Sequence, residues 1–539
     1  MPLAHNISGQ HLINGTWVGG GGGSGDGGAF EATSPATGAA LAPKFAEAGE
    51  SEVNLAMMAA VSAFEASLDL PPRWSADLLD AIGAKVMDLG EALLERAEGE
   101  TALPRPRLTM ERGRTVNQLK MFAEVVREGS WVDATIDTAD PHRAPLPKPD
   151  VRRMLRPRGP AAVFGASNFP FAFSTVGGDT ASALAAGCPV IVKGHPSHPG
   201  TSELFAAAVL AALHETRLPL GLFALLQGRS HELSGLLVRH PGIAAVGFTG
   251  SQKAGRALFD LAAARPSPIP VYAEMGSINP LVILPGAFDD RMAKIAEGLG
   301  ASVLMGGGQF CTKPGVVFAV GERSASLVSR LKKVIGHVPP VTMLNPSLRD
   351  NFMRRVHELE RTEDVGAADY PEEPLGAAGT TAALFETDAE IFQREPTLRE
   401  EVFGPSTLVI HCKDTAELLA CLDRVEGSLT GTLHIGAGDD AATVRAVLRK
   451  LEEKVGRVVV NGYPTGVEVN HAMVHGGPYP ATTDAGTTSV GSSAIRRFVR
   501  PLAYQDAPQP VLPPALQNAN PLGIERTING HRTRDAIGG

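Results

Sequence analysis

The sequence has few cysteines, and their spacing does not suit a metal. Four occur among 539 residues, Cys188, Cys311, Cys412 and Cys421. They form neither a CxxC pair nor a Cys/His set with zinc spacing, so we expect no metal site. So few cysteines in a long chain also indicate a reducing compartment without structural disulfides. A cysteine with a chemical role must therefore be recognised by its surroundings.

Basic clusters and long apolar runs are scarce as well. The formal net charge is -9, and no cluster of Lys and Arg is rich enough for a nucleic-acid footprint. No run approaches the ~18 apolar residues of a membrane span, and the N-terminus lacks a basic start followed by an apolar stretch. We expect a soluble cytoplasmic protein that binds neither nucleic acid nor membranes.

The composition is that of a globular α/β protein, with 43% hydrophobic and 20% charged residues. The length predicts about three domains. Residues 11–18 and 29–34 are typical of short strands, which we expect to be the two arms of a hairpin joined by GGGGGSGDGG. Residues 50–68 and 75–127 carry apolar side chains at helical spacing and predict helices.

Residues 159–263 alternate short apolar strands with helices, the strands being AAVFGAS, PVIVKG, LFALLQG and AAVGFTGS. This alternation predicts a parallel, doubly wound sheet, which binds ligands at the carboxyl ends of its strands. Asn168, Lys193, Gly228, Gly250 and Ser251 lie at those ends. Gly250 and Ser251 precede a helix and fit a phosphate site or a plain N-cap equally well. Because Gly-x-Gly-x-x-Gly is missing, the sheet alone does not prove a dinucleotide site.

Two further regions complete the chain. Residues 141–160 are rich in proline and arginine, and we expect a solvated edge strand there rather than an anion site. From residue 316 onward strands and helices alternate again, for example in GVVFAV, TLVIHC, LTGTLHI and GRVVVNG. This second alternation predicts a second sheet domain.

Cys311 lies in the segment Met305–Val317, MGGGQFCTKPGVV, between a glycine run and a Lys-Pro-Gly turn. This setting suits a nucleophile, although a single cysteine is more often a small buried hydrophobe. A free thiol, with a pKa near ~8.5, needs a base, a cation or a helix N-terminus to react quickly at neutral pH. Glu274 is the candidate base: burial is expected to raise its pKa, unless it is an edge glutamate facing solvent.

Six motifs in order, FGASNFPF, IVKGHPSHPGTS, GFTGS, AEMGSINP, GGGQFCT and EEVFGP, resemble those of NAD(P)-dependent aldehyde dehydrogenases, over roughly residues 11–500. The forms QFCTKPG and HAMVHGGPYPATTD are similar to those of a branch with α-ketoglutaric semialdehyde dehydrogenases and an NADP-linked bacterial fatty-aldehyde dehydrogenase.

The resemblance implies a fold of three parts: a Rossmann-like cofactor domain without the usual glycine fingerprint, an α/β catalytic domain and a small β region that bridges subunits. We assign to them, in this order, residues 1–137 with 159–275, residues 276–480, and residues 138–158 with 481–539. The resemblance further implies a homodimer or a dimer of dimers.

The resemblance also implies roles for single residues. Cys311 is the expected nucleophile, Glu274 the base, and Asn168 a donor to the oxyanion together with the Cys311 backbone N–H. For a histidine that tunes the thiol we take His471, with His475 as the other candidate and a purely structural histidine as the alternative. From the resemblance and the strand ends, the expected cofactor residues are Lys193, His195, Ser197, Gly228, Gly250, Ser251, Glu401 and Phe403.

The residues around Lys193 bear on the choice between NADP and NAD. Relatives that prefer NAD often carry a glutamate three residues after the strand-end lysine, where this chain has Pro196. Without that carboxylate, and with Lys193, His195 and Ser197 close by, we expect NADP to be preferred and NAD to be accepted.

The expected reaction is oxidation of an aldehyde to a carboxylic acid through a thiohemiacetal and a thioester on Cys311. The expected substrate is 2,5-dioxovalerate (α-ketoglutaric semialdehyde), whose carboxylate needs a cation such as Arg114, Arg153 or Arg156. The alternative is a medium- or long-chain aliphatic aldehyde, held by Phe169, Phe171, Phe173 and Phe310.

Two readings from other classes stay open. One is a cysteine hydrolase or acyltransferase that uses Cys311 with His471, and the other is a non-catalytic scaffold of the same fold. The set of Lys193, Ser251 and Glu401 argues against the first, because such a hydrolase needs no nicotinamide.

Overall fold

The computed structural model describes residues 3, 5–19, 28–367 and 376–538. Most of the Gly-rich tract, and so its expected role as a hairpin loop, lies outside the described residues. The expected pairing of its two flanks is wrong: β1 (His11–Ile13) pairs with β2 (Thr16–Val18), and β3 (Ala29–Thr33) with β4 (Ala40–Ala46). Asn14 and Gly15 both have positive φ, so the Asn-Gly pair closes the first hairpin by itself.

The first large sheet has the order β11-β10-β7-β8-β9-β1-β2, and the predicted parallel arrangement is confirmed for its first five strands. These strands are short and almost wholly buried, as expected with helices on both faces. They are β7 (Ala161–Phe164), β8 (Val190–Lys193), β9 (Phe223–Leu226), β10 (Ala245–Thr249) and β11 (Val271–Glu274).

Side-chain alternation along β7 shows how the two faces are covered. Ala161 and Val163 pack into the cluster of α2 (Trp74–Asp88), α4, α5 and α6, whereas Ala162 and Phe164 pack into that of α1, α7 and α8. The helix α3 packs against α4 and α6. The bounds of these helices are α1 Glu50–Ser67, α3 Gly90–Thr101, α4 Arg105–Glu128, α5 Asp179–Ala185, α6 Pro199–Thr216, α7 His231–Arg239 and α8 Gln252–Ala263.

The second large sheet has the order β15-β17-β18-β13-β12-β19-β20. The sequence VYAEMGSINPLVIL, which looks like one strand, is divided: β11 ends at Glu274 in the first sheet, and β12 begins at Leu281 in the second. Its strands are β12 Leu281–Ile283, β13 Val316–Val320, β15 Gly366–Ala367, β17 Ala383–Asp388, β18 Ser406–Cys412, β19 Ser428–His434 and β20 Val455–Val460. Its helices are α9 Pro285–Leu304, α10 Ser324–Ile335, α11 Pro346–Glu360, α12 Ala389–Arg394, α13 Thr415–Arg424 and α14 Ala441–Lys454, and β14 (Val341–Thr342) pairs with β16 (Gly379–Thr380) beside it.

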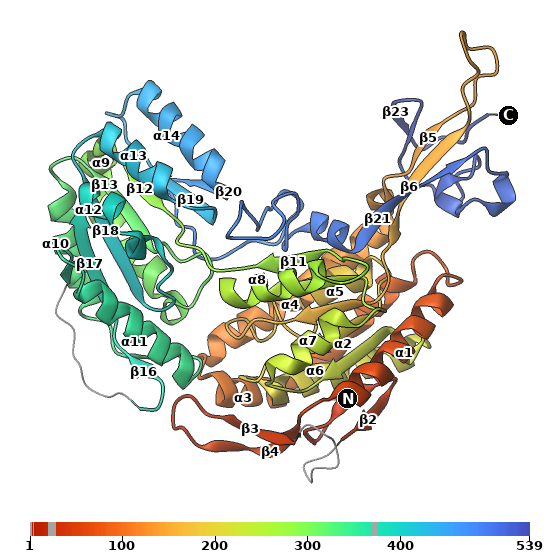
Figure 1. Ribbon diagram of the computed structural model, residues 1–539, viewed down its shortest axis with the longest axis horizontal. Helices are drawn as coiled ribbons and strands as arrows, with labels where there is room; N and C mark the ends of the chain where they lie inside the picture. Colours follow the sequence, from red (N-terminus) through yellow and green to blue (C-terminus); the bar gives the residue numbers. More distant parts are fainter. Residues whose placement is uncertain (1–2, 4, 20–27, 368–375, 539) are drawn as a thin grey trace.

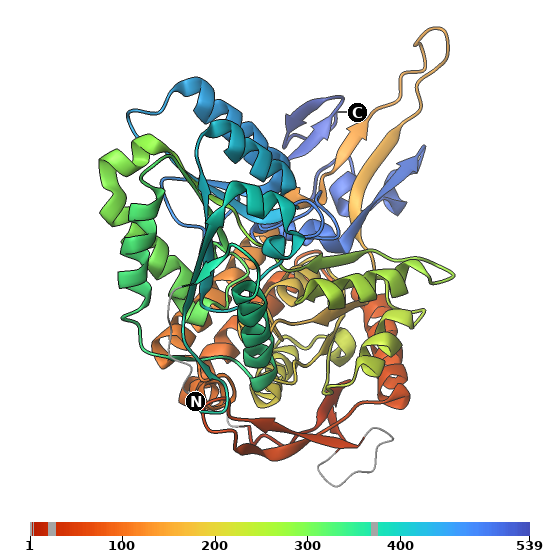
Figure 2. The same ribbon diagram turned by 60° about the vertical axis from the view of Figure 1, so that its left-hand side comes forward.

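A third, five-stranded sheet projects from the body, with the hairpin between β5 and β6 at its tip (Figures 1 and 2). Its order is β21-β6-β5-β22-β23, so β6 pairs on both sides and the expectation of an edge strand at 141–160 is wrong. The strands are β5 Thr135–Asp137, β6 Val151–Pro157, β21 Val499–Gln505, β22 Arg526–Ile528 and β23 His531–Thr533.

The division into three parts stays a prediction, but part of the segment assigned to the bridging region packs on the first sheet. The chain before β21 lies against the first sheet: Thr483 Oγ1 accepts a hydrogen bond from the Ala273 N–H at 2.9 Å, and Arg497 contacts Asp179 of α5. None of the described helices is both long and apolar enough to cross a membrane.

Candidate active site

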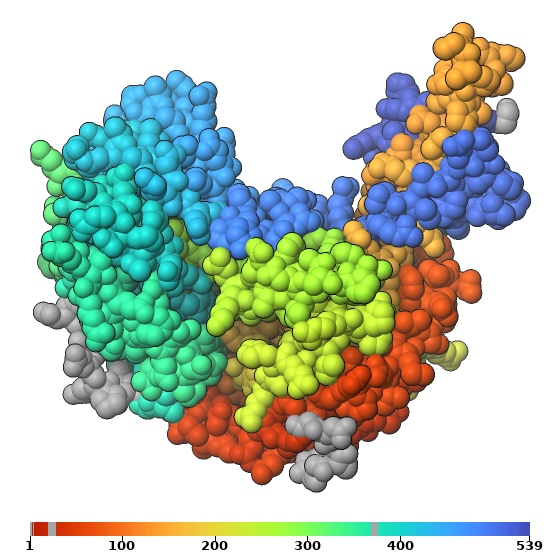
Figure 3. Space-filling view, viewed as in Figure 1, coloured from red at the N-terminus to blue at the C-terminus, as the bar shows by residue number. Residues whose placement is uncertain are grey.

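A cleft of about 1540 Å³ runs between the two large sheets. In Figure 3 it opens between the teal surface of the second sheet's helices and the yellow-green surface around α7 and α8. The carboxyl ends of β7, β10 and β11 lie in its wall, as a parallel sheet predicts. Of the expected site residues, those lining it are Asn168, His195, Ser197, Gly250, Ser251, Glu274, Cys311, Glu401 and Phe403.

The loop that carries Cys311 is held by backbone contacts on both sides. Gly308 has φ +68, and a Cβ on it would lie 2.2 Å from the Gly404 carbonyl oxygen. The glycine run therefore permits close approach of another loop of the chain. On the other side, the Asn279 amide donates to the carbonyl oxygens of Cys311 at 2.7 Å and Lys313 at 2.9 Å. Cys311 thus sits on a rigid loop just before β13.

The histidine beside the thiol is His475. Its Nε2 lies 3.4 Å from Cys311 Sγ, and its Nδ1 lies 3.1 Å from Glu274 Oε2. Its backbone N–H donates to Thr488 Oγ1 at 2.8 Å, which anchors the loop. The choice of His471 is corrected here, because His471 is exposed and does not line the cleft.

Glu274 is 3% exposed, yet its pKa is not raised as the sequence led us to expect. Burial alone would raise the pKa, but the hydrogen bond from His475 and the charge and hydrogen bond of Arg497 outweigh it, and the pKa lies below its ordinary value. Arg497 Nη2 lies 2.5 Å from Glu274 Oε1, and Nη1 lies 3.2 Å from Asp179 Oδ1. Arg497 is 1% exposed, so this contact is a fully buried ion pair.

His475 carries the opposite shift. Burial would lower its pKa, but the charge of Cys311 and the hydrogen bonds to Cys311 and Glu274 raise it to about 9. The histidine is therefore an imidazolium at neutral pH, with one ring N–H toward the sulfur and the other toward the carboxylate. The His475 ring thus contacts both the sulfur and the carboxylate, one through each nitrogen.

Asn168 lies on the same side of the cleft, after β7. The side-chain amide of Asn168 donates to the Gln309 carbonyl oxygen at 2.8 Å. The backbone carbonyl oxygen of Asn168 accepts from Arg107 Nη2 at 2.8 Å. An amide nitrogen carries two hydrogens, so a second donor remains for a ligand near Cys311. The cleft thus combines a thiol, an imidazolium–carboxylate pair and an amide donor.

Comparison with known proteins decides the family. The model of the Aldehyde dehydrogenase family matches residues 23–480. The chain belongs to the aldehyde dehydrogenase family. It is 47% identical over 529 residues to α-ketoglutaric semialdehyde dehydrogenase 2 of Azospirillum brasilense (97% of this chain, 99% of that protein). It is 43% identical over 493 residues to the α-ketoglutaric semialdehyde dehydrogenase of Acinetobacter baylyi (91% of this chain, 93% of that protein).

Solved structures of the family share the fold. The γ-glutamyl-γ-aminobutyraldehyde dehydrogenase of Burkholderia cenocepacia superposes with a TM-score of 0.78 at 22% identity, over 93% of this chain and 97% of that one. A 1-pyrroline-5-carboxylate dehydrogenase superposes with a TM-score of 0.77 at 21% identity, over 92% of each chain. The expected aldehyde dehydrogenase fold is confirmed.

The cofactor end of this aldehyde dehydrogenase differs in part from expectation. Lys193 and Gly228 do not line the cleft. Burial lowers the pKa of Lys193 to about 8, against the opposing charge of Glu47. Ser251 Oγ accepts from the Ala254 N–H at 3.3 Å, so Ser251 is the N-cap of α8. Ser251 also lines the cleft. The helix N-terminus and the size of the cleft fit a dinucleotide.

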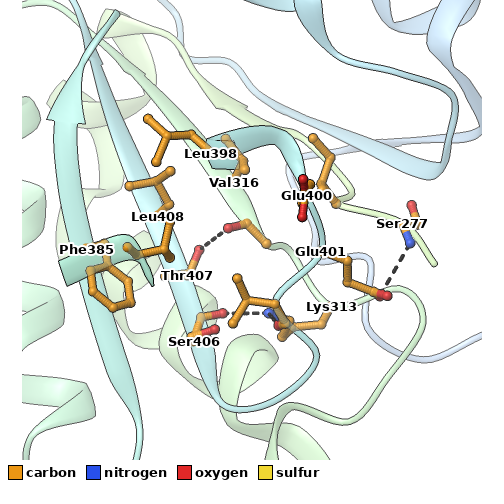
Figure 4. Close-up of a pocket in the computed structure, with 14 residues that line it drawn as sticks. Ser277, Lys313, Val316, Phe385, Leu398, Glu400, Glu401, Ser406, Thr407 and Leu408 are labelled. Atoms are coloured by element: carbon orange, nitrogen blue, oxygen red, sulfur yellow. Dashed lines mark hydrogen bonds between the residues drawn. The ribbon is translucent and has the colours of Figure 1, made fainter. Parts of the chain in front are cut away.

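Glu401 and Lys313 both line the small pocket shown in Figure 4. Lys313 is 3% exposed, and its Nζ donates to the carbonyl oxygens of Val402 at 2.9 Å and Ser406 at 2.7 Å. Glu401 Oε1 accepts from the Ser277 N–H at 3.3 Å. Burial raises the pKa of Glu401 and lowers that of Lys313. The charge of each group opposes the shift of the other.

The sequence reasoning missed Lys313, Asn279, Arg497 and Asp179. Lys313 alone left a signal, as a lysine two residues after the cysteine and before Pro-Gly. Arg497 and Asp179 could not be paired from the sequence, because 318 positions separate them.

We expect Lys313→Met to loosen the loop that carries Glu401 and Phe403. Two buried carbonyl oxygens lose a charged donor, which costs about 1.5–3 kcal/mol, and the KM for the nicotinamide cofactor should rise about tenfold. Steady-state kinetics with varied cofactor measure this. Lys332→Met is the control, because that lysine is 44% exposed and pairs with Glu386 rather than with a buried carbonyl oxygen. An unchanged cofactor KM in Lys313→Met would contradict this role.

Proposed function

We propose that this aldehyde dehydrogenase oxidises 2,5-dioxovalerate to 2-oxoglutarate, with NADP as the preferred cofactor and NAD as an accepted one. The observation that carries the proposal is the chain of contacts from Cys311 through His475 to Glu274 at the wall of the cleft. The names of the relatives that share 47% and 43% identity support the choice of substrate. NAD(P)-dependent aldehyde oxidation is the reaction class that the family indicates.

In the first step, the Cys311 thiolate attacks the aldehyde carbon. The imidazolium of His475 stabilises the thiolate before attack. The carbonyl oxygen becomes an oxyanion near the free hydrogen of the Asn168 amide and the backbone N–H of Cys311. Such donors act most strongly on charge that appears only as the bond forms, and one donor contributes about 3 kcal/mol to lowering the barrier.

A bound nicotinamide dinucleotide would supply the hydride acceptor in the second step. Glu401 and Phe403 from the second sheet, and Gly250 and Ser251 at the N-terminus of α8, are the residues that would hold it. Their placement on both walls of the cleft supports a cofactor that lies across it. The acyl group then remains on the Cys311 sulfur as a thioester.

In the last step a water molecule hydrolyses the thioester. Once the sulfur is acylated it carries no negative charge, so the contact that favours the imidazolium form of His475 is lost. His475 can then release its proton and afterwards accept one from the attacking water, while Glu274 orients the ring and stabilises the renewed imidazolium. In this proposal Glu274, the expected base, acts through His475.

The preference for NADP rests on the charges near the adenosine end. Arg229, His231 and Lys253 line the cleft there together with His195 and Ser197. The nearby carboxylate of Glu47 already accepts from the backbone N–H groups of Arg229 at 2.9 Å and Ser230 at 2.7 Å. Arg229 and Lys253 are two cations that favour a 2′-phosphate.

Assembly is proposed to involve the third sheet. Its strand β21 pairs only with β6 among the described strands, so one edge is left free for another copy of the chain. We propose a homodimer or a dimer of dimers, and a cytoplasmic location in keeping with four free cysteines.

The proposal is tested with the purified enzyme, 2,5-dioxovalerate, hexanal and both cofactors. We expect one NADPH and one 2-oxoglutarate to form for each aldehyde consumed. The kcat/KM should be at least about tenfold higher for 2,5-dioxovalerate than for hexanal, a difference of about 1.4 kcal/mol. It should also be higher with NADP than with NAD. Faster oxidation of hexanal would favour the aliphatic alternative. Hydrolysis of an ester without any reduction of cofactor would favour the cysteine hydrolase.

The pH dependence of kcat/KM tests the His475–Glu274 pair. His475 has a raised pKa of about 9, so its charge is present at neutral pH and is lost as the pH rises through about 9. The lowered pKa of Glu274 keeps its carboxylate charged at neutral pH and below. We expect kcat/KM to fall as the pH rises through about 9, and His475→Gln to lack this decline. A decline that persists in His475→Gln would assign it to another group.

A further inference from the structure

Helix α4 presents three charged residues on one face. Arg107, Glu111 and Arg114 are spaced by four and three positions and so lie on the same side of the helix. Arg107 lies 4.8 Å from the centroid of the Phe169 ring, and Arg114 lies 5.0 Å from that of Phe173. Both aromatic residues belong to the loop that follows Asn168, so this face of α4 lies beside the catalytic loop.

The two arginines differ in their hydrogen bonding. Arg107 donates to the Asn168 carbonyl oxygen at 2.8 Å and lies 3.6 Å from Glu111 Oε2, so it holds the loop in place. Arg114 Nη1 is buried and has no hydrogen-bond partner among the described residues. Its Nη2 makes one long contact, 3.4 Å, to the Val467 carbonyl oxygen. A buried guanidinium with unused donors is costly unless an acceptor is supplied.

Two side chains, Phe173 and His475, connect Arg114 with the reacting sulfur. The ring of Phe173, on which it stacks, lies 6.1 Å from that of His475 between centroids, and His475 contacts Cys311 Sγ. Burial lowers the pKa of Arg114, while the charges of Glu111 and Cys311 oppose this. A chain of contacts through Phe173 and His475 thus links Arg114 to Cys311.

The other candidate cations are already engaged or lie elsewhere. Arg457 also senses the charge of Cys311, but it donates to the carbonyl oxygens of Pro464 at 2.6 Å and Gly466 at 3.3 Å. Arg153 and Arg156 belong to β6 of the third sheet, where Arg153 pairs with Asp133 at 3.1 Å and Arg156 lies opposite Arg500.

We propose that Arg114 binds the distal carboxylate of the aldehyde substrate and so selects an acidic aldehyde over an aliphatic one. The unused Nη1 hydrogens and the Nη2 donor form the planar fork that a carboxylate accepts. The rings of Phe169, Phe173 and Phe310 hold the carbon chain between this anchor and Cys311. An aliphatic tail in the same place would leave the guanidinium buried without an acceptor. The inference rests on the proposed function.

Arg114→Gln tests it, because glutamine keeps a polar side chain without the charge. We expect the KM for 2,5-dioxovalerate to rise about 30- to 100-fold, in the range of one charged hydrogen-bonded contact, while kcat/KM for hexanal stays within about twofold or increases. Arg114→Lys, which keeps the charge but not the fork, should fall between the two. Arg112→Gln is the matched control, since that guanidinium is on the same helix but donates to the Gly90 carbonyl oxygen at 2.9 Å.

A second measurement does not depend on turnover. Glutarate should protect Cys311 of the unaltered enzyme from alkylation by iodoacetamide, and should protect Arg114→Gln at least about tenfold less well, about 1.4 kcal/mol. The assignment would be overturned if Arg114→Gln lost kcat/KM equally for both aldehydes. It would also be overturned if glutarate protected Cys311 equally well in Arg114→Gln and in the unaltered enzyme. If the unaltered enzyme prefers hexanal, the proposed function fails by itself, and glutarate protection then decides whether Arg114 binds a carboxylate.

Discussion

A buried chain of charges holds the reactive centre together. It runs from Asp179 through Arg497, Glu274 and His475 to the thiol of Cys311. Its members come from α5, from the end of β11, from the loop before β13 and from the two late segments that lie over the first sheet. Breaking a buried pair such as Arg497–Glu274 typically costs about 3–5 kcal/mol, because it leaves a charge without a partner. This chain of charges thus connects the two large sheets at the wall of the cleft.

The chain of charges also explains why the two titrating groups shift in opposite directions. Glu274 is buried beside His475 and Arg497, and its pKa is lowered, whereas His475 is buried between the Cys311 sulfur and the Glu274 carboxylate, and its pKa is raised. Neither shift follows from burial alone, which would have moved both groups toward their neutral forms. The partners therefore decide the protonation states, and with them the division of roles between nucleophile, imidazolium and carboxylate.

Much of the fold could be predicted from the sequence, because short apolar strands alternating with helices have few stable arrangements. Strand ends also located Asn168, Glu274 and Ser251 at the cleft wall. The choice between His471 and His475 could not be made, since an irregular loop has no periodicity that tells which side chain points inward. The pKa of Glu274 was misjudged for a related reason: His475 and Arg497, which lower it, lie 201 and 223 positions away. Phe171 was also misplaced, because it packs on Phe205 in the core of the first sheet.

In the proposed mechanism the imidazolium of His475 activates Cys311, and the rate of alkylation of Cys311 at neutral pH measures this activation directly. Iodoacetamide should modify Cys311 in His475→Gln at least about tenfold more slowly than in the unaltered protein, because the cation beside the thiolate is gone. His471→Gln, altered at the exposed histidine of the same loop, should react at the unaltered rate. An unchanged rate in His475→Gln, or a slower rate in His471→Gln alone, would contradict activation of Cys311 by His475.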